Sequence, residues 1–361
     1  MKSRKYQEIH DALASEIQKG VYDADGTLPG ENVIAGRFST ARETVRKALA
    51  MLAHEGFVTR RMGAGTYVAK RARRRTGEFG LLMPDVSSAR IFRDFVTEIR
   101  RLARRNGYEV VVDEFMEESA EAAAVRVRRI ARGMVVRNVE GVVFRPFVDE
   151  RLADANMEVV RIFKNAGMPV VLLDADVVES LKRSECDLVA IDNVSAGRRV
   201  AEHLIARGYR RIAFLMQGGA FRSNINWRNR FFGVAGESAL RGIAEAVTPL
   251  YFEPGDIARL RRLCRSRFRP QAIVCGNDET AVLLMESLRT LGKRIPRDIA
   301  VVGFDDVDIA ACTVPALTTV RQPSRDIARA ALRTLLGRIA RPNDDPREVL
   351  VNAPLVVRSS T

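Results

Sequence analysis

Short apolar runs alternate with helix-patterned segments from residue 78 to residue 361. Each run holds four or five residues and is rich in β-branched and aromatic side chains. Strand–helix alternation of this kind is typical of parallel sheets covered by helices on both faces. The length favours two doubly wound subdomains over one large sheet. We therefore predict an α/β fold, with strands at Phe79–Met83, Val110–Asp113, Gly141–Phe144, Val170–Leu173, Leu188–Ile191, Ile212–Met216, Ala272–Cys275 and Ala300–Phe304 and with helices such as Ile91–Arg105, Ser195–Arg207 and Glu279–Leu291.

Residues 1–70 follow a different pattern. Apolar residues recur at helical spacing from Tyr6 to Ile17, and again from Val45 to Leu52. A short helix is predicted between them over residues 31–38. Two short strands, Phe57–Arg61 and Thr66–Val68, follow with a glycine-containing turn between them. Short helices followed by a basic hairpin predict a winged helix-turn-helix domain over residues 1–70.

Positive charge is concentrated in this first segment. The chain of 361 residues has a formal net charge of +14, and residues 1–75 hold 15 Lys or Arg against 8 Asp or Glu. Arginines dominate residues 71–77, which read as a basic linker. An excess of this size suggests a polyanionic partner, and a helix-turn-helix fold makes that partner double-stranded DNA.

The third predicted helix has the residue types needed to read DNA. Arg42 and Arg46 lie one turn apart on its polar face, and arginine binds guanine edges or phosphates with two hydrogen bonds. Thr44 can reach a phosphate or a thymine methyl group. In the hairpin, Arg60 and Arg61 are expected to contact phosphates. Glycines at the hairpin tip let the backbone approach DNA closely, and these are Gly63 and Gly65.

The run LPGENVIAGRFSTARETVRKALAMLAHEGFVTRRMGAGTYVAK resembles the DNA-binding domain of the GntR family, and the resemblance covers residues 4–70. Its ordered motif ends in Gly63-x-Gly65-Thr66, so Thr66 joins the expected DNA-binding residues. Asn32 and Ala41 depart from the family pattern, and an operator sequence therefore cannot be transferred from a relative.

Polar residues follow the predicted strands of the second segment at their carboxyl ends. Ligands of such folds bind in the crevice at those ends. Carboxylates and amides beside an arginine and an aromatic ring are suited to a polyhydroxylated ligand. The polar positions include Asp85, Arg145, Asp174, Asp192, Gln217, Asn277 and Asp305, with Arg228 and Arg230 nearby.

Several runs of this segment resemble the effector domain of lac-repressor-type regulators, which is similar to periplasmic sugar-binding proteins. The runs are IDNVSAGRRVAEHLIARGYRRIAFL, WRNRFFG, CGNDETAV, RIPRDIAVVGFDDVDIA and PALTTVRQP. The resemblance spans residues 78–360. It implies a first subdomain of about 78–191 plus 317–341 and a second of about 193–315 plus 345–361. It also implies that Arg230 anchors the ligand and that Asn277 and Asp305 bind ligand hydroxyls. The remaining wall or stacking residues are Asp85, Phe92, Asp192, Trp227 and Arg228.

A GntR-like head on a lac-repressor-like body resembles regulators of the arabinose-repressor type. This resemblance implies a homodimer on a pseudo-palindromic operator, released by a small sugar or sugar derivative, with no cofactor and no metal site. One alternative is a DNA-binding regulator whose cleft is vestigial or binds a protein or a non-sugar metabolite. A sugar-acting enzyme is a weaker alternative, since no phosphate-binding loop, GxSxG motif or metal set accompanies the carboxylates.

Other classes are disfavoured by what the sequence lacks. The first residues show no apolar core of a secretory signal, and no run approaches the roughly 20 apolar residues of a membrane span. The four cysteines have no CxxC spacing, and the three histidines lie far apart. We therefore expect a cytoplasmic protein without a membrane partner, a zinc site or a catalytic triad.

Overall fold

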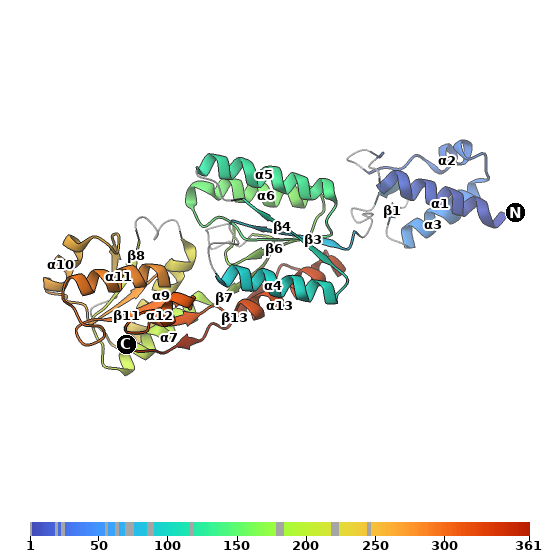
Figure 1. The fold of residues 1–361 in the computed structure, drawn as a ribbon. Coiled ribbons are helices and arrows are strands. Elements are labelled where there is room, and N and C mark those ends of the chain that lie inside the picture. The colour runs from blue at the N-terminus through green and yellow to red at the C-terminus, as the bar shows by residue number, and fades with distance from the viewer. Residues whose placement is uncertain are drawn as a thin grey trace.

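The structure is a computed structural model. It describes residues 2–18, 21–22, 26–54, 57–61, 65–68, 76–84, 90–115, 119–177, 184–217, 224–243 and 247–361. Three parts follow one another along the chain: a small helical head, a first α/β subdomain and a second one (Figure 1).

The head contains three helices and a two-stranded hairpin. Helix α1 packs against α3, and α2 packs against α3 as well. The side chains predicted to form the apolar stripes, including Ile9, Leu13, Val45 and Leu49, are fully buried in one cluster. The hairpin strands pair antiparallel, with Val58 opposite Val68. This is the expected winged helix-turn-helix, made of α1 (Lys2–Gln18), α2 (Glu31–Arg37), α3 (Arg42–His54), β1 (Val58–Arg61) and β2 (Gly65–Val68).

The first subdomain is built on a parallel sheet with the strand order β4-β3-β5-β6-β7-β13. Helices α5 and α6 cover one face, while α4 and α13 lie together on the other (Figure 1). Strands such as β6 are apolar throughout because both faces are buried. The elements are β3 (Glu78–Met83), α4 (Arg90–Arg105), β4 (Glu109–Glu114), α5 (Ala120–Arg137), β5 (Val142–Phe144), α6 (Ala153–Asn165), β6 (Val170–Leu173), β7 (Asp187–Ile191), α13 (Ser324–Ala340) and β13 (Glu348–Val351).

The second subdomain repeats this plan with the order β14-β12-β11-β10-β8-β9. All its strands are parallel except β14, which runs antiparallel to β12. Helices α7 and α9 pack tightly together on one face, and α10, α11 and α12 belong to the core on the other. The elements are α7 (Asn193–Ala206), β8 (Ile212–Met216), α9 (Ile225–Leu240), β9 (Thr248–Tyr251), α10 (Ile257–Arg265), β10 (Ala272–Cys275), α11 (Asp278–Thr290), β11 (Ala300–Asp305), α12 (Asp308–Cys312), β12 (Thr318–Arg321) and β14 (Leu355–Val356).

The chain crosses between the two sheets three times: after β7, after β12 and after β13. The expected division is wrong at two strands. Strand β12, expected in the first subdomain within 317–341, pairs with β11 of the second sheet. Strand β13, expected in the second subdomain within 345–361, pairs with β7 of the first sheet. Both strands have four residues, and their composition does not indicate which of the two sheets each strand joins.

Candidate effector cleft and DNA-binding face

Three of the predicted DNA-binding arginines meet at one carboxylate of the head. Glu31, at the start of α2, accepts hydrogen bonds from Arg42 Nε at 2.7 Å and from Arg46 Nε at 3.1 Å through its Oε2 atom. Its other oxygen binds Arg60 of β1. The hydrogen bond from Arg42 lowers the pKa of Glu31, and the one from Arg46 adds to the effect. Glu31 was not among the predicted DNA-binding residues, although it lies within the run that carries the GntR resemblance.

The remaining predicted DNA-binding residues lie near this cluster or outside the described residues. Thr44 is half-buried on α3. Thr66 lies in β2, where its carbonyl accepts a hydrogen bond from the Leu28 amide at 2.8 Å. Arg61 ends β1, and the structure does not describe its side chain; Gly63 lies outside the described residues. Gly65 has a φ of 112°, and nothing lies near the position of an added Cβ, so backbone conformation rather than space calls for glycine.

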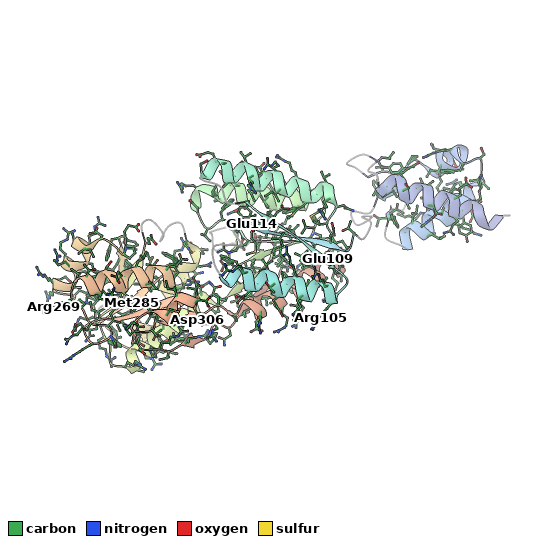
Figure 2. The ribbon with its side chains drawn as sticks, viewed as in Figure 1. Arg105, Glu109, Glu114, Arg269, Met285 and Asp306 are labelled. Carbon is green, nitrogen blue, oxygen red and sulfur yellow. The ribbon has the colours of Figure 1, made fainter. Side chains whose placement is uncertain are left out.

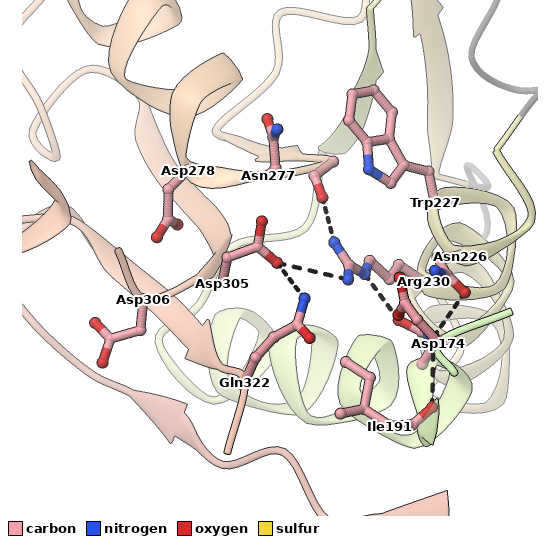
Figure 3. Close-up of polar contacts among 12 residues, drawn as sticks. Asp174, Ile191, Asn226, Trp227, Arg230, Asn277, Asp278, Asp305, Asp306 and Gln322 are labelled. Atoms are coloured by element: carbon pink, nitrogen blue, oxygen red, sulfur yellow. Dashed lines mark hydrogen bonds and ion pairs between the residues drawn. The ribbon is translucent and has the colours of Figure 1, made fainter. Parts of the chain in front are cut away.

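Arg230 of α9 is the centre of a polar cluster between the two subdomains. Only 3% of it is exposed. Its Nε donates to Asn193 Oδ1 at 2.9 Å, its Nη1 donates to the Gly276 carbonyl at 2.6 Å, and its Nη2 lies 3.7 Å from Asp305 Oδ1 (Figure 3). The guanidinium also stacks over the Phe304 ring, 4.6 Å from its centre. These contacts fix the orientation of Arg230 and leave Asp305 as its charged partner.

Asp305 ends β11 with a φ of 112°. Its Oδ1 accepts a hydrogen bond at 2.7 Å from Gln322 Nε2, on the crossover from β12 to α13. Burial raises the pKa of Asp305, while the charge of Arg230 acts in the opposite direction. Gln322 was not among the predicted site residues. It lies within the run PALTTVRQP, but its contact with Asp305 depends on how the two sheets meet.

The first subdomain contributes a second ion pair to this region. Arg145, which follows β5, donates to Asp174 Oδ2 at 2.9 Å, and its guanidinium stacks on the Phe92 ring at 4.6 Å. Both charged groups are close enough to Asp305 to influence its pKa. A small cavity of about 30 Å³ is lined by Phe92, Arg145, Asp174, Ile191 and Gln322 among others. The carboxyl ends of the two sheets therefore face each other across this polar cluster.

A larger cavity of about 360 Å³ lies beside the cluster and also reaches Asp305 and Gln322. Asp94 of α4 and Asp308 of α12 line it from the two subdomains. Asp306 binds Arg321 Nε and Arg358 Nη2 there, each at 2.6 Å. The neighbouring carboxylates of Asp305 and Asp306 thus have different partners, and only the former belongs to the Arg230 cluster (Figure 3).

The other predicted effector residues take local roles. Asn277 accepts a hydrogen bond from the Thr280 amide and caps α11, and Asp192 caps α7 through the Ser195 amide. Trp227 packs on Gly276 so closely that an added Cβ there would lie 2.3 Å from the indole ring. The Arg228 side chain makes no hydrogen bond or ion pair with another described residue. Asp85 lies outside the described residues.

One buried acid near the cluster has a strongly shifted pKa. Asp278, only 1% exposed, accepts hydrogen bonds from Thr319 Oγ1 at 2.5 Å and from the Val307 amide at 2.9 Å. Burial raises the pKa of Asp278 to about 8, and the charge of Asp305 contributes in the same direction. Asp278 is therefore largely protonated at neutral pH and supports the loop that carries Asp305.

The described residues contain neither a group of metal ligands nor a membrane-spanning helix. Among them, no three His, Cys, Asp or Glu side chains are grouped in a way that holds a metal ion. None of the helices in those ranges is both long enough and apolar enough to cross a bilayer.

Comparison with known proteins places both parts of the chain. Residues 5–68 match the gntR family of bacterial regulatory proteins, and residues 201–361 match a periplasmic binding protein-like domain. The arabinose metabolism transcriptional repressor of Geobacillus stearothermophilus is 28% identical, over 99% of this chain and 97% of that protein. A ribose operon repressor of Halalkalibacterium halodurans is 26% identical, over 79% of this chain and 80% of its own length.

Solved structures agree on the fold. A lac repressor dimer bound to operator and the anti-inducer ONPF superimposes with a TM-score of 0.63 and 21% identity, over 80% of this chain and 95% of that one. Both of the relatives described above are repressors, one of arabinose metabolism and one of a ribose operon. The chain therefore joins a winged helix-turn-helix domain that matches the gntR family of bacterial regulatory proteins to a periplasmic binding protein-like domain.

Proposed function

We propose that the protein is a repressor that a small sugar or sugar derivative releases from its operator. The polar cluster between the subdomains supports this proposal most directly. Arg230 and Asp305 from one subdomain and Arg145 and Asp174 from the other are paired with each other or with Gln322. Adjacent hydroxyl groups of a sugar can take over these hydrogen bonds, and the Phe92 and Trp227 rings can pack on its apolar faces.

The position of the cluster supplies a mechanism. Ligand groups that bind Arg145 and Arg230 together hold the two subdomains at one separation. A ligand shifts the protein toward that closed state only because it binds this state more tightly than the open one. The chain crosses between the subdomains next to these residues, at Asp192 and Gln322. Closure of the cleft therefore acts directly on these connecting segments.

We further propose a homodimer on a pseudo-palindromic operator, with Arg42, Arg46 and Arg60 as the main DNA contacts. Two heads related by a twofold axis match two half-sites of the same sequence. Three exposed aliphatic side chains of the second subdomain support dimer formation: Leu283 on α11, Ile309 on α12 and Val314, which is 90% exposed. Helices α11 and α12 are in contact, so exposed apolar groups on them can belong to one contact surface.

The experiment that tests the effector proposal combines a ligand screen with one variant. Melting of the purified protein is measured with monosaccharides, sugar acids, sugar phosphates and polyols. A ligand present at about 100 times its Kd stabilises the protein by about 2.7 kcal/mol. The stabilising compound is then added to an operator complex, which should dissociate. In Arg230→Ala, ligand-free operator binding should persist and both responses should be lost.

Two results would contradict the proposal. A normal ligand response in Arg230→Ala would place the effector elsewhere. A panel without any stabilising compound, in a protein that binds its operator, would favour a vestigial or protein-binding cleft.

A further inference from the structure

Basic side chains gather where the strands of the second sheet begin, at their amino ends, far from the head. Residues 207–211, 266–271 and 291–299 lead into β8, β10 and β11, which are parallel neighbours. These connections therefore meet at the amino ends of the strands. Gln271 joins them, since its side chain accepts from the Arg210 and Arg211 amides at 2.8 and 3.1 Å and its carbonyl accepts from the Ala300 amide at 2.9 Å.

The three connections hold eight Lys or Arg and one acidic residue, Asp298. Asp298 is already engaged by Arg294 at 3.0 Å. The side chains of Arg265, Arg267, Arg269 and Arg297 are exposed and make no ion pair with another described residue. Figure 2 shows Arg269 at the tip of the second subdomain. We call this surface the distal arginine face and define it by Arg210, Arg211, Arg265, Arg267, Arg269 and Arg297.

Helix ends and overall composition do not explain the distal arginine face. One cation per helix carboxyl end complements the helix dipole, but Arg210, Arg267 and Arg297 lie beyond the helices. The first sheet provides an internal comparison with the same architecture. Its helix-to-strand connections hold two Arg and three acidic residues, whereas those of the second sheet hold nine Lys or Arg and two acidic residues. Cations are thus concentrated at the amino ends of the second sheet's strands and not at those of the first sheet's strands.

We propose that the distal arginine face binds the phosphate backbone of a second segment of duplex DNA, without reading its sequence. Guanidinium groups form paired hydrogen bonds with phosphates, and clustered cations repel one another until an anion neutralises them. DNA is favoured over other polyanions because the head already holds the protein on DNA, which gives further duplex a high local concentration.

The position of the face indicates which duplex it meets. The head joins the first subdomain at β3, whereas the face lies at the outer end of the second subdomain near α10 (Figure 1). The operator segment beneath the head is therefore not the segment that the face contacts. A protein bound at its operator would in this way hold a second duplex and bridge two DNA segments.

A capture assay tests this bridging. Full-length protein is bound to an immobilised operator duplex, and a labelled duplex of unrelated sequence is added at increasing salt. The variant Arg267→Gln/Arg269→Gln/Arg297→Gln removes three unpaired cations from the face. The matched control, Arg100→Gln/Arg129→Gln/Arg161→Gln, removes the same number of exposed arginines from α4, α5 and α6.

Wild-type protein and the control should capture the second duplex. The distal variant should lose at least tenfold in captured duplex, and its log–log salt dependence should fall by about 2 to 3, since each lost phosphate contact removes about 0.9. Operator binding, measured on the same surface, should not change in either variant. Unchanged operator binding separates the proposal from the function of the head, and it shows that both variants are folded.

Three results would overturn the proposal. The first is a wild-type protein that captures no second duplex. The second is an equal loss in the distal and control variants. The third is capture of polyglutamate or of anionic phospholipid vesicles in place of duplex DNA, which would assign the face to an acidic protein or a membrane surface.

Discussion

Arginine side chains are held in two different ways in this molecule. Arg230 is buried, and its donors are directed to Asn193, Gly276 and Asp305. It therefore presents one fixed orientation to a ligand. Arg42 and Arg46 are about half exposed and share the carboxylate of Glu31. Their guanidinium groups can turn toward DNA at small cost, because exposed ion pairs contribute little to stability.

Removing either of these head arginines should weaken DNA binding. We expect Arg42→Ala or Arg46→Ala to cost roughly 1–3 kcal/mol of operator binding if the side chain reads a base, with relaxed specificity at one position of each half-site. Fluorescence anisotropy with an operator duplex and with single-base variants measures both effects. Lys47→Ala, on another face of α3, serves as the control and should act alike on all sequences. Wild-type affinity in both arginine variants would contradict the docking geometry.

The buried acid Asp278 should make stability depend on pH. Its pKa is about 8 in the folded protein, whereas an unfolded chain ionises near the ordinary value of 3.8. Between these values the unfolded state binds fewer protons, so stability falls as pH rises, by up to about 1.4 kcal/mol per pH unit for this group.

Asp278→Asn removes the ionisation; its carbonyl oxygen can still accept from the Val307 amide, and its NH2 group can donate to Thr319 Oγ1. Urea unfolding at pH 5, 6, 7 and 8 should therefore show a flatter profile in the variant than in wild type. Parallel profiles would mean that Asp278 titrates normally in the folded protein.

Single-residue positions were predictable where a strand end fixed them. Arg230, Asp305 and Arg145 follow or face the carboxyl ends of strands, and the parallel sheet brings such ends together. Glu31 and Gln322 were missed because their partners lie 11 or more residues away and belong to other elements. The capping roles of Asp192 and Asn277 are compatible with the sequence pattern, which does not separate capping from ligand binding.

At the scale of elements, wholly apolar strands were predictable and strands of mixed composition were not. Strands β6, β8 and β10 have the expected bounds, since their apolar runs are buried on both faces. Strand β9 was missed: it lies at a sheet edge, is only partly buried and contains Pro249. Strands β12 and β13 hold polar residues among the apolar ones and owe their place to the neighbours that pair with them.

The wing supplies a test at this scale. We expect Gly65→Ala to destabilise the hairpin by roughly 1–3 kcal/mol, because a φ of 112° is costly for any residue with a Cβ. Operator affinity should fall, while effector-induced stabilisation of the two subdomains, residues 78–361, should stay unchanged. Gly30→Ala is the matched control, since Gly30 has an ordinary φ of −57° and open space around it. Equal operator affinity in the two variants would show that the wing does not contact DNA.

At the scale of the whole molecule, DNA recognition should depend on dimer formation. Leu283 and Ile309 are exposed aliphatic residues on adjacent helices of the second subdomain. We expect Leu283→Asp/Ile309→Asp to shift sedimentation toward the monomer and to weaken binding to a full operator at least tenfold. Binding to a single half-site should remain. A variant that still sediments as wild type would place the dimer contact on another surface.

The three crossings between the sheets have a consequence for how such a protein changes during evolution. Each subdomain is assembled from separate stretches of sequence, so no single exchange of a gene segment transfers one of them intact. The head, in contrast, is one continuous stretch with its own core. A new operator specificity can thus be acquired in one recombination event, whereas a new effector specificity has to arise by substitutions within an intact body.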